Sequence, residues 1–223
     1  ADLYDISSPP TAKHLLGTDA SGRDVLSRLL YGSRISITIG LVAVSIACVI
    51  GTFLGMCAAY FGGIADTVIM RTMEALRSVP SVILAMALVT IYGGGFRNVA
   101  IILGISTVPG YVMMMRAQVL SVKSTDYVTA ARLQGNSSLR LMLRHILPNC
   151  LSVIIISAAL QVPSAIFTES YLSFLGLGVR APMPSLGSLA NAAREGLQSY
   201  PYKLVFPALT ICLIVLSLNL LGD

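Results

Sequence analysis

Residues 36–60 read SITIGLVAVSIACVIGTFLGMCAAY, a run without a single charged side chain. A bilayer core about 30 Å thick is crossed by a helix of about 20 apolar residues. A charge at the centre of such a helix would cost about 2.5 to 3.5 kcal/mol on insertion scales, so its absence here is informative. The stretch therefore predicts a transmembrane helix, and with it an all-α integral membrane protein.

Further apolar stretches of similar size follow along the chain and predict a polytopic helical bundle with five transmembrane helices. The four later spans are expected at residues 64–92, 99–120, 150–172 and 204–221. Between the last two spans, a segment rich in Gly, Pro and Ser predicts a loop with a short helix at 188–197. Because two spans separate this loop from the N-terminal segment, both are expected on the same side of the membrane.

Three of the expected spans contain a proline inside their apolar run, namely Pro80, Pro109 and Pro163. We expect residues 64–92 to form one long helix, half of it interfacial, with a kink at Pro80. Proline within a span is tolerated where neighbouring helices or a water-lined cavity satisfy the freed carbonyl group. The prolines thus fit either a bundle with an internal path or kinks that serve packing alone.

The composition supports a membrane protein and excludes several functions. Apolar residues make up 55% of the chain and charged residues 11%, against about 25% charged in a soluble domain. The net charge of +5 comes from basic residues between apolar runs, which suit lipid headgroups or a protein partner better than nucleic acid. The four cysteines form no CxxC pair and the two histidines lie far apart, so no metal site is expected.

Residues 127–149, YVTAARLQGNSSLRLMLRHILPN, form a basic segment between two apolar runs. One of the residues 124–126 can cap a short helix at 127–134, and Gly135 can end that helix in the left-handed conformation. A second short helix can begin after residue 136 and end before Pro148. The segment therefore predicts two short helices hinged at a glycine.

The first of these helices carries Tyr127, Ala130 and Ala131 at positions i, i+3 and i+4. One aromatic ring beside two methyl groups suits an interface, because small residues allow close approach while the ring fills a pocket. The alternative is an amphipathic hairpin that rests on the membrane surface.

The pair YVTAARLQG and RHILPN resembles the EAA loop, the cytoplasmic coupling segment of permease subunits in ATP-binding-cassette (ABC) importers. More narrowly, it is similar to the branch that handles dipeptides, oligopeptides, nickel and glutathione. The stretches at 14–37, 174–187 and 218–223 resemble the same branch, so the likeness covers essentially the whole chain. The chain departs from the pattern at the namesake glutamate, which is Thr129, and in the outer loop at Ala181 and Leu186.

The resemblance implies the type I ABC importer permease fold in the cytoplasmic membrane of a bacterium or archaeon. It implies an external segment at 1–35, a transmembrane domain at 36–223, a cytoplasmic coupling loop at 121–148 and an external loop at 172–203. Counting Lys and Arg alone leaves this orientation open. The family has one more span before the external segment, so we expect a six-span subunit of which five spans are present here.

The resemblance also implies partners. No GxxxxGK[ST] motif occurs in the chain, so the protein is expected to be no enzyme and to hold no cofactor, with ATP and Mg²⁺ bound by one or two separate ABC ATPase subunits. A second homologous permease, an external substrate-binding protein and the lipid bilayer complete the expected partners. The ATPase contact is expected at Tyr127, Ala130, Ala131, Leu133, Gly135 and Leu139.

Polar residues inside the expected spans are candidates for the substrate path. These are Ser106, Thr107, Tyr111, Gln161 and Glu169. Each could instead satisfy a kinked backbone or a neighbouring helix. Peptide import is the leading function; its rivals are import of nickel, a metal chelate or glutathione by the same machinery, and ion-coupled secondary transport. A membrane-embedded enzyme is disfavoured, since no pairing of nucleophile and base stands out.

Overall fold

The computed structural model describes residues 6–194, 196–198 and 200–222. Within these ranges the chain is helical apart from its connections and one isolated bridge between Thr18 and Asp24. The helices are α1 (Val25–Phe61), α2 (Gly63–Arg77), α3 (Ser81–Tyr92), α4 (Phe96–Lys123), α5 (Asp126–Leu133), α6 (Ser138–Arg140), the π-helical η1 (Leu141–Ile146), α7 (Leu147–Phe174), α8 (Leu186–Arg194) and α9 (Tyr202–Gly222).

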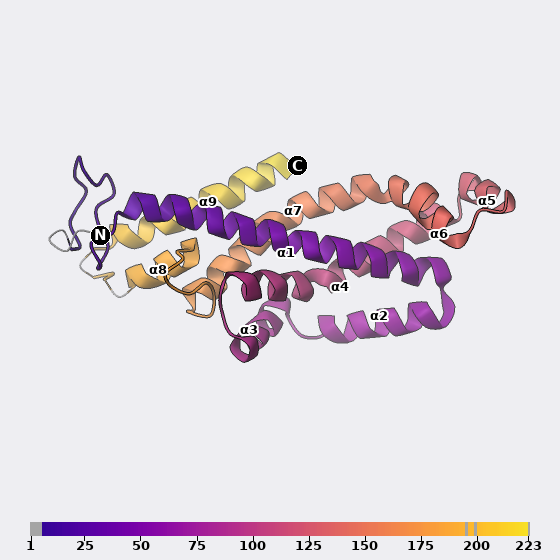
Figure 1. Cartoon of the computed structure of the whole chain (residues 1–223), viewed down its shortest axis with the longest axis horizontal. Helices are drawn as coiled ribbons and strands as arrows, with labels where there is room; N and C mark the ends of the chain where they lie inside the picture. Colours follow the sequence, from indigo (N-terminus) through magenta and orange to yellow (C-terminus); the bar gives the residue numbers. More distant parts are fainter. Residues whose placement is uncertain (1–5, 195, 199, 223) are drawn as a thin grey trace.

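The long helices lie side by side in an elongated bundle (Figure 1). Helix α1 runs along most of its length and packs against both α4 and α7. The N-terminal segment, α8 and the start of α9 lie at one end, whereas α5 and α6 lie at the other (Figure 1). The N-terminal segment and the loop before the last span therefore lie at the same end of the bundle.

Small residues allow α1 and α4 to approach closely. A Cβ atom added to Gly55 would lie 2.6 Å from the carbonyl oxygen of Val112, and one added to Gly104 would lie 2.9 Å from Cβ of Ile46. Helices in a membrane gain little from the hydrophobic effect, so such close packing is a main source of their association.

Among the described residues, four helical stretches are long and apolar enough to cross a membrane: α1, α4, the continuous stretch Ser138–Phe174, and α9. Helices α2 and α3 meet the same test as a pair but are bent by 85°. The expectation of one long helix with a kink at Pro80 is therefore wrong. Pro80 lies outside both helices in an extended conformation, with ψ of 131°, because proline lacks a donor N–H and disfavours helical geometry in the residue before it.

A second expectation also needs correction. The second helix of the basic segment was expected to end before Pro148, but helical structure continues from Ser138 through η1 into α7. Pro148 lies in the first turn of α7, where a missing N–H is tolerated, and the wider π-helical turn of η1 precedes it. Half of the basic segment is thus the end of a membrane-spanning helix.

The segment before α1 is held together by Asp19. Its carboxylate accepts the backbone N–H groups of Ser21 and Arg23 at 2.8 and 2.9 Å, pairs with the Arg23 side chain at 3.0 Å and also contacts Arg28. Partial burial opposes ionisation of Asp19, but these donors and the two arginine charges outweigh it and hold the pKa of the carboxyl group below its ordinary value.

Candidate functional site

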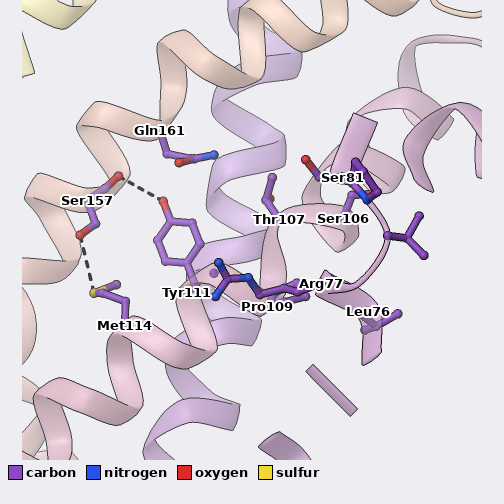
Figure 2. Close-up of a pocket in the computed structure, with 13 residues that line it drawn as sticks. Leu76, Arg77, Ser81, Ser106, Thr107, Pro109, Tyr111, Met114, Ser157 and Gln161 are labelled. Atoms are coloured by element: carbon purple, nitrogen blue, oxygen red, sulfur yellow. Dashed lines mark hydrogen bonds between the residues drawn. The ribbon is translucent and has the colours of Figure 1, made fainter. Parts of the chain in front are cut away.

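A cavity of about 410 Å³ opens in the bundle where α4 and α7 face the break between α2 and α3 (Figure 2). Both Pro80, at that break, and Pro109, inside α4, line it. Two of the three prolines highlighted in the expected spans therefore border one hollow, which favours the internal path over kinks that serve packing alone.

Four of the five polar residues expected along the substrate path line this cavity: Ser106, Thr107, Tyr111 and Gln161. The hydroxyl group of Ser106 donates to the carbonyl oxygen of Ile102 at 2.8 Å, and that of Thr107 donates to the carbonyl oxygen of Leu103 at 3.0 Å. Because both hydroxyl groups donate their hydrogen bonds to the backbone of α4, only their oxygen atoms remain, as acceptors, for a group in the cavity.

Tyr111 joins the two helices that form the cavity wall. Its hydroxyl group donates to the carbonyl oxygen of Ser157 in α7 at 3.5 Å, and the Ser157 hydroxyl contacts Met114 Sδ at 3.6 Å (Figure 2). The Tyr111 side chain is largely buried between the helices. Its position thus depends on how α4 and α7 are spaced.

Glu169 does not share this cavity. It is fully buried, with 0% exposure, and its Oε1 accepts a hydrogen bond from the Ser173 hydroxyl at 2.7 Å. The same Ser173 oxygen accepts the backbone N–H of Val179 at 3.1 Å. Glu169 therefore fixes the loop after α7 to the helix end, outside this cavity.

Among the polar side chains that line the cavity, those of Arg77, Ser81 and Ser157 escaped the sequence analysis. Arg77 is the last residue of α2. The sequence pattern of this helix indicated an interfacial segment, where a charged side chain is expected and gives no sign of a site. The available signal was the position of Arg77 three residues before a proline inside an expected span. Ser157 carries no such signal, since serine is common inside membrane helices.

The basic segment at the opposite end of the bundle has the predicted hinge. Helix α5 spans Asp126–Leu133, close to the expected 127–134, and Gly135 has φ of +81°. The Asn136 side chain donates to the carbonyl oxygen of Ala131 at 2.8 Å and so closes the C-terminal end of α5. The left-handed conformation expected for Gly135 is confirmed.

The exposed face of α5 differs in part from the expected one. Tyr127, Leu133 and Leu139 are 44%, 84% and 66% exposed, and Ala130 is also exposed. Ala131 is only 5% exposed, beside the fully buried Val128, because this side of α5 packs against η1. The placement of Ala131 on an accessible surface is therefore wrong. We call the exposed residues Tyr127, Ala130 and Leu133 of α5, together with Leu139 of α6, the α5 face.

A cluster of charges and rings attaches α5 to the end of α1. Lys123 Nζ donates to the carbonyl oxygens of Ala59 and Tyr60 at 3.1 and 2.6 Å. Both Lys123 and Arg132 lie over the Tyr60 ring, at 5.5 and 5.9 Å from its centroid. A cation suits the last turn of a helix, and Arg132 extends the contact to α5. The ends of α1 and α4 and helix α5 are thereby connected.

A membrane bundle with a hollow between broken helices and a hinged segment at one end defines the permease class of membrane proteins. Residues 51–223 match the family model described as "Binding-protein-dependent transport system inner membrane component". The chain belongs to this family, and it is a permease subunit of the ABC importer type.

Curated relatives cover nearly the whole chain. It is 40% identical over 221 residues to the glutathione transport system permease protein GsiD of Pectobacterium atrosepticum, covering 99% of this chain and 73% of that protein. It is 44% identical over 212 residues to the di/tripeptide transport system permease protein DppC of Pseudomonas aeruginosa, covering 95% and 70%.

Solved structures with low sequence identity share the fold. Inward-facing conformations of the MetNI methionine ABC transporter align with a TM-score of 0.69 at 17% identity, covering 89% of this chain and 94% of that one. An amino acid ABC transporter aligns with a TM-score of 0.66 at 16% identity, covering 88% and 92%. The all-α permease fold expected from the sequence is therefore confirmed.

Proposed function

We propose that this chain forms part of the path by which small peptides cross the cytoplasmic membrane of a bacterium or archaeon. The observation that carries the proposal is the mid-bundle cavity, whose walls combine apolar surface with hydroxyl and amide groups from Ser106, Thr107 and Gln161. Groups of this kind can exchange hydrogen bonds with peptide amides. The relatives named for glutathione and di/tripeptide transport support the same substrate class.

We further propose that the α5 face receives a separate ABC ATPase subunit that binds ATP and Mg²⁺. Large apolar side chains stand exposed on this helix beyond the ends of the long helices (Figure 1), and such side chains suit a protein partner. Since α6, η1 and α7 are continuous, a displacement at the hinge would reach the cavity wall through α7. ATP would thereby bias a bundle with two conformations.

The remaining partners complete the proposed transporter. A second, homologous permease would close the open side of the cavity, and an external substrate-binding protein would deliver the peptide to the end that carries residues 6–35 and 172–203. Residues 121–148 would then lie in the cytoplasm.

The test is ATP-driven uptake of a radiolabelled dipeptide by the assembled transporter in proteoliposomes. Replacing Ala130 with Arg should reduce uptake at least tenfold, since a long charged side chain would separate the α5 face from the ATPase subunit. Ala130→Ser keeps the residue small and is the matched control. Full uptake by the Ala130→Arg variant at normal membrane levels would contradict docking at the α5 face.

The chemistry of the cavity favours a peptide or a chelate over a bare metal ion. Among its lining residues that the structure describes, none is Asp, Glu, His or Cys, and Arg77 is positively charged. Divalent nickel is bound by imidazole, thiolate or carboxylate groups. If the same vesicles took up free radioactive nickel but did not take up the dipeptide, that result would instead support nickel import. Uptake that follows an ion gradient without ATP would support secondary transport.

A further inference from the structure

We propose that Arg77 recognises the carboxylate group of the transported solute, so that the cavity itself selects for a free carboxylate. This inference rests on the proposed function and adds a specificity-determining residue to it. The sequence pattern predicted an interfacial helix around Arg77.

Arg77 lines the cavity about halfway along the bundle, and within this chain its side chain is exposed. It is the last residue of α2, at the 85° bend before α3, and this bend lies beside the middle of α1 (Figure 1). Figure 2 shows its guanidinium group on the side of the cavity formed by Tyr111. Tyr111 and Gln161, which share the lining, lie near the midpoints of α4 and α7.

A guanidinium halfway along membrane-spanning helices requires a compensating interaction, because a charge near the centre of a membrane is costly. The C-terminal end of a helix also favours a cation, but by less than this cost. The position at the end of α2 therefore does not account for the charge.

The neighbouring arginines pair with carboxylate groups, whereas the hydrogen-bond partner of Arg77 is a thioether sulfur. Arg116 forms two hydrogen bonds with the Asp66 carboxylate, both of 2.6 Å, and Arg71 pairs with Glu74 at 3.0 Å. Over the described part of the chain, the hydrogen bond found for Arg77 joins Nη1 to Met113 Sδ at 2.6 Å. A thioether is a weak acceptor, and a guanidinium has five N–H donors, so most of its donors remain for a ligand.

Arg77 also sets the charge of the cavity, since every other lining residue that the structure describes is uncharged. A carboxylate matches the planar fork of a guanidinium with two parallel hydrogen bonds. The volume of about 410 Å³ lies within the range of about 300 to 1,000 Å³ usual for small-molecule sites. The geometry thus suits a small solute with a carboxylate at one end and amide groups along its length.

The test compares uptake of alanyl-alanine with uptake of its C-terminal amide by the complete transporter in proteoliposomes. The substrate-binding protein is supplied saturated with either solute, so that its own affinity does not enter the maximal rate. For the unaltered transporter, the ratio of the two maximal rates should favour the free acid about tenfold, as expected for one charge-assisted interaction. Arg77→Gln should bring this ratio close to one, and Arg77→Lys should retain most of it.

Arg71→Gln is the matched control, because Arg71 lies on the same helix outside the cavity, and it should leave the ratio unchanged. An unchanged ratio in Arg77→Gln, with uptake still dependent on ATP, would overturn the role of Arg77 and leave the proposed function intact. Absence of ATP-dependent uptake of both solutes by the unaltered transporter would overturn the proposed function, and the role of Arg77 with it.

Discussion

Single residues determine the geometry at both ends of the bundle. Gly135 sets the angle between α5 and the helix that follows, and Asp19 organises the segment before α1. The hinge at Gly135 was predictable, since a glycine that follows a short helical pattern and precedes a second one signals a left-handed residue. The burial of Ala131 was not predictable, because the inner face of α5 is decided by its contact with η1.

Replacing Gly135 with Ala should destabilise the hinge by about 1 kcal/mol or more, since φ of +81° disfavours any residue with a Cβ atom. No atom lies within 4 Å of the added methyl group, so the effect comes from the backbone alone. Hydrogen exchange in α5 should become faster, and peptide uptake should fall. Gly196→Ala is the control, since its Cβ would make ordinary contacts at 3.9 Å or more; an equal effect of both changes would refute the backbone explanation.

Acid should loosen the N-terminal segment through Asp19. The pKa of its carboxyl group is lower in the fold than the ordinary 3.8, so its stabilising effect is complete above about pH 4 and is lost as the pH falls through the folded value. The protection of the Ser21 and Arg23 amides against hydrogen exchange, taken relative to the intrinsic rate at each pH, should therefore fall below that pH. In Asp19→Asn this acid step should vanish; if it persisted, another group would be responsible.

At the scale of elements, the positions of the membrane-spanning helices were predictable, whereas the points at which a helix breaks or continues were not. Uncharged apolar runs located α1, α4, α7 and α9 to within a few residues at most ends, although α1 begins at Val25, well before the expected Ser36. Residues 25–35, which include Arg28 and Arg34, extend α1 beyond the uncharged run, and a search for uncharged apolar stretches cannot detect this extension. The helix breaks at Pro80 but continues across Pro148. Which of the two happens depends on how the residues around each proline pack against other helices, and the pattern of a single sequence does not show that packing.

The cluster around Tyr60 predicts that α5 moves together with the end of α1. Tyr60→Leu removes the ring that both Lys123 and Arg132 contact and should increase the number of ATP molecules hydrolysed per peptide imported severalfold. Tyr60→Phe keeps the ring and should behave as the unaltered protein does. The ratio is measured from phosphate release and uptake in the same vesicles, and an unaltered ratio in Tyr60→Leu would show that the cluster only holds the fold together.

The whole molecule has two distinct ends, and this polarity makes its proposed orientation testable. In a background with Cys212→Ser, a cysteine at Ala20 should react in intact cells with a thiol reagent that cannot cross the membrane. A cysteine at Ala130 should react only after the membrane is opened, because the two positions lie at opposite ends of the bundle (Figure 1). The reverse pattern would invert the orientation proposed for residues 6–35 and 121–148.

Helix α7 is anchored at both extremes, by η1 on the hinge side and by the Glu169, Ser173 and Val179 hydrogen bonds on the far side. We propose that α7 moves as one body, so that a displacement at the hinge would also displace the loop at its far end. The two mouths of the proposed path would then change together, and one would close as the other opens.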